Sequence, residues 1–206
     1  ASGCIYGLVA LGFVLIYKAT ETINFAQGDI LMLGAFVAFS LIGVLGMNYI
    51  VGFVLTVMII AVFGFFLDAV VVRQIIGQPA FATVMLTIGL GFIFRGFASI
   101  YWGTDIFSFS TPFSGKITEV GGLIISYVNI SIIVGTTLLM GILFAFFSFT
   151  KIGVAMRASS ENQLAAYYMG IPVKFIFSLI WSISAGVAAI AGVLLAPITL
   201  VDTSIS

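Results

Sequence analysis

Polar side chains suited to holding a small polar solute gather near the N-terminus, within otherwise apolar sequence. Asn24, Gln27 and Asp29 flank Gly28, and together they supply amide donors, amide acceptors and one carboxylate. A zwitterion or an amide-bearing solute requires groups of these kinds. The cluster is therefore a candidate binding element.

The stretch that carries this cluster, residues 18–29, separates two apolar runs. It is too short for an aqueous loop between two full membrane spans, and it predicts a membrane helix interrupted near 18–28. Transporters use helices broken at membrane depth to contact polar substrates near the midplane. A tight cytoplasmic turn, in which Gly28 and Asp29 start the next helix as its N-cap, fits the same spacing equally well.

A second candidate is Arg95, which lies inside the apolar run over 80–103. A guanidinium at membrane depth is costly, and it usually faces an acidic partner or a water-filled path. The expected partner is Asp68 on the preceding span. A structural role, with the two side chains reaching toward opposite interfaces, is favoured over a role in lining a pathway. As a lining residue, Arg95 would attract a carboxylate.

A third polar segment, residues 151–174, is long enough to hold a short helix between two spans. Ser159 or Ser160 can cap this helix, and Glu161 lies near its positive end. Gly170 and Pro172 then end it. A capped helix in this place is typical of a docking element. An ordinary interfacial amphipathic helix is the alternative interpretation.

The composition indicates that the elements that position these residues lie in a lipid bilayer. Of 206 residues, 62% are hydrophobic and only 7% are charged. The mean hydropathy is +1.32, outside the range of water-soluble domains. A formal net charge of zero gives no reason to expect nucleic acid as a partner. Cys4 is the only cysteine and histidine is absent, so neither an intramolecular disulfide nor a Cys/His metal site is expected.

Six apolar runs separated by polar clusters predict an all-α, polytopic transmembrane helical bundle of about six spans. The runs cover residues 1–17, 28–47, 50–72, 80–103, 126–149 and 175–197. None alternates with a period of two, so a β-barrel is not expected. If the spans alternate in direction, the basic residues that fall together on one side are Lys18, Arg73, Lys151, Arg157 and Lys174. The positive-inside rule makes that side cytoplasmic, and only Lys116 falls opposite.

Several motifs, in their order and spacing, resemble the LivH-type permeases of branched-chain amino acid ABC importers over essentially the whole chain. They are ALG at 10–12, LIY at 15–17, INFAQGD at 23–29, MLGA at 32–35, IGQP at 76–79, MLTIGL at 85–90, the stretch 157–171 and AGVL at 191–194. The stretch 157–171 resembles the coupling loop of ABC permeases, because Ala165-Ala166, Gly170 and Ile180 match its spacing. Leu164 stands in place of the usual Glu, and Gln27 stands where family members commonly carry His.

The resemblance implies a single ABC-transporter permease transmembrane domain over residues 1–206, incomplete at its C-terminus, with a cytoplasmic coupling segment at 151–174. It implies a multi-pass protein of the bacterial inner membrane. The implied partners are ABC ATPase subunits, a second permease subunit, an extracytoplasmic solute-binding protein, an amino-acid substrate and membrane lipid. The expected residues of the substrate pathway are Asn24, Phe25, Gln27, Gly28, Asp29, Thr87 and Arg95. The expected residues of ATPase coupling are Arg157, Glu161, Ala165, Ala166 and Gly170.

The sequence contains no G-x-x-x-x-G-K-[ST] motif, so this chain is not expected to hydrolyse ATP. Without histidine, a metal motif or an arrangement that would activate a Ser or Cys, a transport subunit is expected and not an enzyme. No cofactor is expected on this chain, and ATP and Mg²⁺ are assigned to the partner ATPases. The expected function is that of a permease subunit in an ATP-driven importer for branched-chain or related amino acids. An ion-coupled secondary transporter of a small polar solute is the alternative. Branched-chain amino acids, other amino acids, amides and urea all fit the polar cluster, and the permease pair can be a homodimer or a heterodimer.

Overall fold

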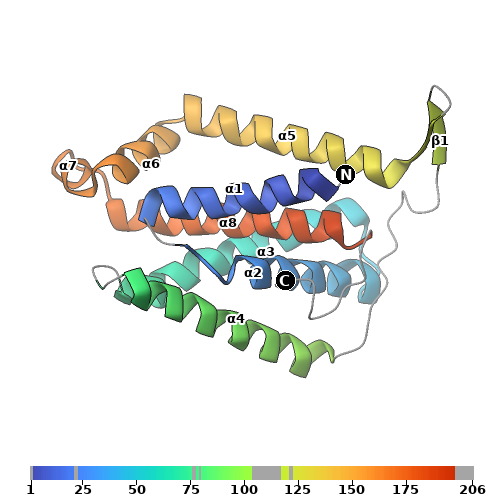
Figure 1. Cartoon of the computed structure of the whole chain (residues 1–206), viewed down its shortest axis with the longest axis horizontal. Coiled ribbons are helices and arrows are strands. Elements are labelled where there is room, and N and C mark those ends of the chain that lie inside the picture. Colours follow the sequence, from blue (N-terminus) through green and yellow to red (C-terminus); the bar gives the residue numbers. More distant parts are fainter. Residues whose placement is uncertain are drawn as a thin grey trace.

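The protein, described here by a computed structural model, forms a helical bundle with one short antiparallel strand pair (Figure 1). The described residues are 2–20, 23–75, 78, 80–103, 117–120 and 123–197. The elements are α1 (Ser2–Thr20), α2 (Gln27–Ala38), the π-helical η1 (Phe39–Val44), α3 (Tyr49–Val70), the 3-10 helix η2 (Val72–Ile75), α4 (Ala80–Trp102), β1 (Ile117–Val120), β2 (Leu123–Ser126), α5 (Tyr127–Phe149), α6 (Lys151–Glu161), α7 (Gln163–Tyr168) and α8 (Val173–Leu195). In the strand pair, Ile117 lies opposite Ser126 and Val120 opposite Leu123.

Within the described ranges, five helical segments are long and apolar enough to cross a bilayer, and α1 adds a shorter apolar helix. The five are α2 with η1, α3 with η2, α4, α5 and α8. Helices form here because lipid offers no hydrogen-bond partners, so each span must satisfy its own backbone groups. The prediction of an all-α polytopic bundle with about six spans is confirmed. The strand pair between α4 and α5 was not predicted.

α8 is the centre of the bundle. It packs against α1, α2 and α3, while α4 lies on the outer side of α2 and α5 on the outer side of α1 (Figure 1). The backbones of α2 and α8 lie very close together. A Cβ atom at Gly34 would lie 2.7 Å from Ala189 Cα, and one at Gly192 would collide with the Leu31 carbonyl oxygen. Helix contacts of this kind, made by small residues, are common in membranes.

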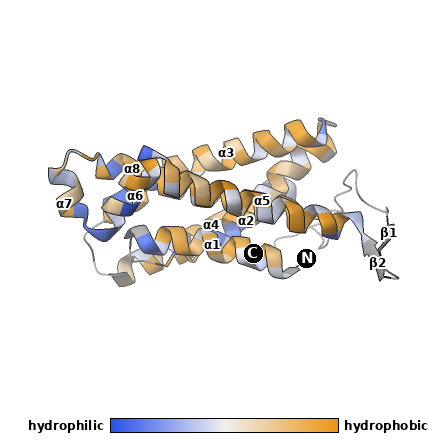
Figure 2. Cartoon of the chain, turned by 90° about the horizontal axis from the view of Figure 1, so that it is seen from above, coloured by the Kyte–Doolittle hydropathy of each residue, from blue (hydrophilic) through white to orange (hydrophobic). Residues whose placement is uncertain are grey.

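The two ends of the bundle differ in polarity. α6 and α7 form one end, where hydrophilic helix surface is most extensive, and the strand pair marks the other (Figures 1 and 2). The basic residues expected on one side all lie at the α6 end. They are Lys18 in the last turn of α1, Arg73 in η2, Lys151 and Arg157 on α6, and Lys174 in the first turn of α8. The positive-inside rule predicts that this end is cytoplasmic. Lys116 lies outside the described residues.

The second span begins without a helix. The described residues between α1 and α2, 23–26, are not helical. Figure 1 shows them running from the α1 end back along the bundle, so that α2 starts inside it. Asn24 and Ala26 are buried, so the break between the two helices enters the interior of the bundle. The alternative in which Gly28 and Asp29 cap the helix is wrong in its cap, because the N-cap position is Ala26, which makes no side-chain cap.

α5 is held only lightly by the rest of the bundle. Its buried residues among those described are Ile132, Thr136 and Leu143, and it contacts α1 and α6. Ser126, at the end of β2, is its N-cap, and Thr150 at its other end is also the N-cap of α6. α5 thus joins the strand pair directly to the cytoplasmic segment.

Candidate functional site

The non-helical segment is held in place by its own polar groups. Asn24 Oδ1 accepts a hydrogen bond from Ala26 N at 3.1 Å, and Asn24 Nδ2 donates to Gln27 Oε1 at 3.3 Å. Phe25 N donates to Thr87 Oγ1 on α4 at 3.2 Å. Backbone donors that have no helical partner therefore find one inside the protein, as backbone at membrane depth requires.

Gln27 ties α1, α2 and α8 together. Its Nε2 donates to the Ser184 carbonyl oxygen at 3.3 Å. Ser184 Oγ lies 2.9 Å from the Gly12 carbonyl oxygen and 3.2 Å from Gln27 Oε1, and its hydrogen can donate to either. A side chain at position 12 would collide with Gln27 Nε2. Sequence analysis did not identify Ser184, because a single serine in an apolar helix carries no spacing signal.

Arg95 pairs with Asp29, and the expected pairing with Asp68 is wrong. Arg95 Nε donates to Asp29 Oδ1 at 2.6 Å. Gly91 lets the carboxylate lie against α4, because a side chain there would collide with Asp29 Oδ2. Asp68 pairs instead with Arg73. The expectation failed because α4 packs mainly along α2, and its contact with α3, the span that precedes it in the chain, includes the rings of Phe63 and Phe94 but not Arg95 and Asp68.

An open cavity of about 190 Å³ adjoins this ion pair. Its lining residues are Phe25, Asp29, Ile88, Gly91, Phe92 and Arg95. Phe25, Asp29 and Arg95 of the predicted pathway therefore meet at one place. Sequence analysis missed Ile88 and Phe92. Their spacing of three to four residues along the face of α4 that carries Arg95 could have identified them.

The other predicted pathway residues do not line this cavity. Asn24, Gln27 and Thr87 are buried, and each makes hydrogen bonds within the bundle. Gly28 is half-buried in the first turn of α2. These residues hold in place the segment that brings Asp29 and Phe25 to the cavity.

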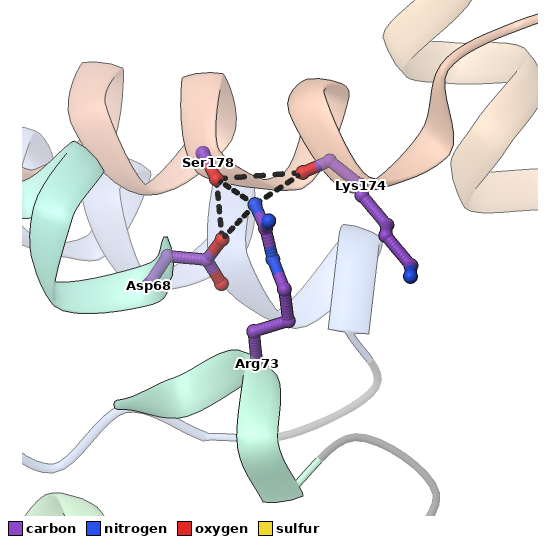
Figure 3. A network of polar contacts seen from close by, with 4 residues as sticks. All are labelled: Asp68, Arg73, Lys174 and Ser178. Carbon is purple, nitrogen blue, oxygen red and sulfur yellow. Dashed lines mark hydrogen bonds and ion pairs between the residues drawn. The ribbon is translucent and has the colours of Figure 1, made fainter. Parts of the chain in front are cut away.

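A second buried polar network joins the cytoplasmic ends of α3 and α8 (Figure 3). Arg73 Nη2 donates to the Lys174 carbonyl oxygen at 3.0 Å and to Ser178 Oγ at 2.5 Å. Ser178 Oγ donates to Asp68 Oδ2 at 2.7 Å, and Arg73 Nη2 lies 3.6 Å from the same oxygen. Because Asp68 is fully buried, its charge depends on these two partners for compensation. The network fixes the first two turns of α8 to the end of α3.

The cytoplasmic segment forms two helices, and its caps differ from the prediction. Thr150 caps α6 and Asn162 caps α7, each through a side-chain oxygen that accepts a backbone N–H. Ser159 and Ser160, which were expected to cap a helix, lie inside α6. The prediction was wrong because the second helix starts only after Glu161, at the next residue that can cap it.

α7 ends where the sequence predicted. Gly170 has a φ of +81°, in the left-handed region that favours glycine. Its N–H donates to the Tyr167 carbonyl oxygen at 3.0 Å. Pro172 then occupies the N-cap position of α8. The two predicted helix breakers therefore set the angle between α7 and α8.

α7 presents large apolar side chains to the outside of the bundle. These side chains are 67–82% exposed and belong to Leu164, Tyr167, Tyr168 and Met169. Of the predicted coupling residues, Ala166 is buried, and those that are exposed are Arg157, Glu161, Ala165 and Gly170. Sequence analysis missed the exposed apolar set. A cluster of apolar residues within a polar cytoplasmic segment is the signal that could have identified it.

The fold defines a multi-pass membrane protein, and an ion pair beside a cavity within its spans is typical of a transport protein. Residues 1–205 match the family described as "Branched-chain amino acid transport system / permease component". The chain belongs to this family.

Similar proteins carry matching names. The chain is 28% identical over 205 residues to the high-affinity branched-chain amino acid transport system permease protein BraD of Pseudomonas aeruginosa. The matched region covers 94% of this chain and 67% of that relative. The same values hold for the high-affinity branched-chain amino acid transport system permease protein LivH of Escherichia coli (strain K12). This chain is also 29% identical over 196 residues to the probable branched-chain amino acid transport permease protein LivH of Methanocaldococcus jannaschii. That match covers 91% of this chain and 61% of the relative. No solved structure matches.

Family and fold together confirm the predicted resemblance to LivH-type permeases. The chain is a multi-pass inner-membrane permease subunit of an amino acid importer of the ABC type. It is a transport subunit and not an enzyme, as the names of its relatives agree.

Proposed function

We propose that this chain is one of two permease subunits of an ATP-driven importer for branched-chain or related amino acids. Its partners are ABC ATPase subunits at the α6 end, a second permease subunit in the membrane and an extracytoplasmic solute-binding protein at the opposite end. ATP and Mg²⁺ bind to the ATPase subunits. This chain contributes the solute pathway and the surface through which ATPase movement reaches it.

The observation that carries the proposal is the exposed apolar face of α7. Tyr168 and Met169 are 77% and 82% exposed. Figure 1 shows α7 beyond the ends of α1 and α8, past the spans that face lipid. Aromatic and methionine side chains are enriched in protein interfaces, so a protein partner suits this face. An amphipathic helix lying on the membrane would instead turn its apolar side toward lipid.

The path from α7 into the bundle is short. α7 leads to α8 through Gly170 and Pro172, and α8 packs against α1, α2 and α3. When closing ATPase subunits move α7, α8 moves with it, and α2 carries Asp29 along. Rigid-body movement of one packed group of helices against another is a general way to open a site alternately to the two sides.

Solute uptake by the assembled importer in proteoliposomes tests the proposal. Leucine uptake is measured with ATP on the α7 side, and separately with an imposed Na⁺ or H⁺ gradient and no ATP. We expect uptake with ATP only. The variant Tyr168→Glu places a charge in the apolar face of α7, and it should lower both ATPase co-purification and uptake by about tenfold or more, equal to 1.4 kcal/mol of docking free energy.

The matched control is Gln163→Glu, which adds the same charge at the start of α7. It should assemble and transport like the unaltered protein. Uptake driven by an ion gradient without ATP would identify an ion-coupled transporter and sink the proposal. Full ATPase co-purification with Tyr168→Glu would show that α7 is not the docking surface.

A further inference from the structure

The ion pair of Asp29 and Arg95 leaves hydrogen-bonding capacity unused. Arg95 contributes only its Nε to the pair. Among the described residues, its two Nη groups donate to no atom and Asp29 Oδ2 accepts from none. The Arg95 side chain is 47% exposed, and both residues line the cavity. The planar donor fork of a guanidinium matches a carboxylate in a bidentate arrangement.

The pair lies at membrane depth. At a rise of about 1.5 Å per residue, Arg95 is about 22 Å from the cytoplasmic start of α4 and about 10 Å from its outer end. An ion pair that only held helices together would be stabilising when enclosed and completely hydrogen-bonded. This one is open on one side, where the cavity begins.

The remaining walls of the cavity are apolar. Phe25 lies at the non-helical segment, and Ile88 and Phe92 lie one turn apart on α4. A volume of about 190 Å³ has room for about six water molecules at roughly 30 Å³ each, and thus for part of a small solute. The cavity therefore combines one positive group, one negative group and an apolar surface within the reach of a single small solute.

We infer that this cavity is a transient binding site for a zwitterionic α-amino acid with an apolar side chain. The solute carboxylate accepts hydrogen bonds from the free Nη groups of Arg95, and its ammonium donates to Asp29 Oδ2. Its side chain lies among Phe25, Ile88 and Phe92. Without solute, the two protein charges neutralise each other; with solute, each gains a second partner. The inference rests on the proposed function and names the class of solute recognised within the membrane.

The chemistry separates this class of solute from others. Urea and neutral amides supply no full charge to either partner, and charge-assisted hydrogen bonds are about twice as strong as neutral ones. A solute with only a carboxylate or only an ammonium leaves one protein charge without the added partner. Only a zwitterion of the right length satisfies both.

Protection of an introduced cysteine tests the site. In the assembled importer in nanodiscs, Cys4→Ser removes the native thiol and Ile88→Cys places a new one in the cavity wall. The rate of its modification by a thiol reagent is measured with leucine, with isopentylamine, with 4-methylpentanoate and with urea. We expect leucine to slow the reaction about fivefold at concentrations well above its Kd, and the other three to leave it within about twofold.

Ile93→Cys is the matched control, because it lies on the same helix and is 63% exposed but does not line the cavity. Leucine should not change its rate of modification. Asp29→Asn combined with Arg95→Gln removes both charges together, which usually spares the fold the cost of one unpaired charge. This double variant should assemble, and leucine should no longer protect Ile88→Cys in it.

Two outcomes would overturn the inference: leucine that fails to protect Ile88→Cys when both charges are present, or leucine that protects the double variant equally well. ATP-driven leucine uptake by the Cys4→Ser importer is measured in parallel. Uptake without protection overturns the inference and leaves the proposed function in place. Loss of ATP-driven uptake in this otherwise unaltered importer overturns the proposed function itself.

Discussion

Neighbouring polar residues on α2 have opposite surroundings. Gln27 and Asp29 are two positions apart, which places them about 200° apart around a helix. Gln27 faces α1 and α8 and is completely buried, whereas Asp29 faces α4 and borders the cavity. The first side chain maintains the packing of three helices. The second carries the charge that a solute can use.

The buried amide of Gln27 is predicted to contribute mainly to stability. Gln27→Leu leaves Asn24 Nδ2 without its acceptor and removes the side-chain donor to the Ser184 carbonyl oxygen, at a cost of about 1–3 kcal/mol. The midpoint of thermal unfolding of the solubilised importer should fall accordingly. The same change at Gln74, which is exposed, should alter stability by less than about 0.5 kcal/mol. Equal effects at the two positions would contradict the structural role of Gln27.

Sequence analysis located the polar residues but did not pair them correctly. Asn24, Gln27, Asp29 and Arg95 stood out because polar groups are rare in apolar runs. Their partners depend on which helices lie side by side, and that depends on close backbone contacts such as the one at Gly34. The sequence indicates only which spans are consecutive along the chain, and on that basis Asp68 was predicted as the partner of Arg95 in place of Asp29.

At the scale of the elements, α8 links the two functional regions. It begins shortly after α7 and its Gly170 turn, is bonded to Asp68 of α3 through Ser178, and bonds to Gln27 near its middle through Ser184. The polar contacts lie at two levels along one helix. These contacts connect the start of α8 with the broken segment of the second span through one continuous helix.

The joint between α3 and α8 is predicted to depend on charge balance. Arg73→Gln leaves the buried Asp68 without a cation and should destabilise the protein by about 2–3 kcal/mol, less than the 3–5 kcal/mol of a fully enclosed pair because Arg73 is partly exposed. Adding Asp68→Asn should restore most of that loss. Thermal unfolding of the two single variants and the double variant gives the coupling energy. Strictly additive losses would show that the pair is not coupled.

The turn between α7 and α8 is predicted to depend on the backbone of Gly170. Nothing surrounds a Cβ atom at this position, so a substitution acts only through the left-handed φ of +81°. Gly170→Val should cost about 1–2 kcal/mol and loosen α7, whereas Gly170→Asn should be milder because asparagine tolerates this conformation. Hydrogen exchange of α7 and ATP-driven uptake measure the difference. Indistinguishable valine and asparagine variants would contradict this account.

At the scale of the whole molecule, a bundle of several apolar spans was predictable because bilayer thickness sets the length of each span. The orientation of the spans stays a prediction of the positive-inside rule. The division of 151–174 into two helices was not predictable, because polar segments outside lipid have no strong period. The strand pair was missed for the same reason. The cavity could not be predicted either, since it arises between α4 and a segment that has no helix of its own.

The orientation leads to a direct labelling prediction. In a Cys4→Ser background, Tyr168→Cys on α7 should react with a membrane-impermeant thiol reagent only in inside-out vesicles. Tyr101→Cys, near the outer end of α4 and 71% exposed, should react only in intact spheroplasts. The two variants control for each other, because both replace an exposed tyrosine. Reaction of both from the same side would contradict the alternating arrangement of the spans.

The attachment of α5 has a mechanical consequence. At about 1.5 Å per residue, its 23 residues make a rod of about 35 Å with the strand pair at one tip and α6 at the other. Few of its side chains are buried, so the rod can tilt or slide at little cost to the packed interior. A push at the outer tip would therefore reach α6 along a stiff helix, none of whose described residues lines the cavity.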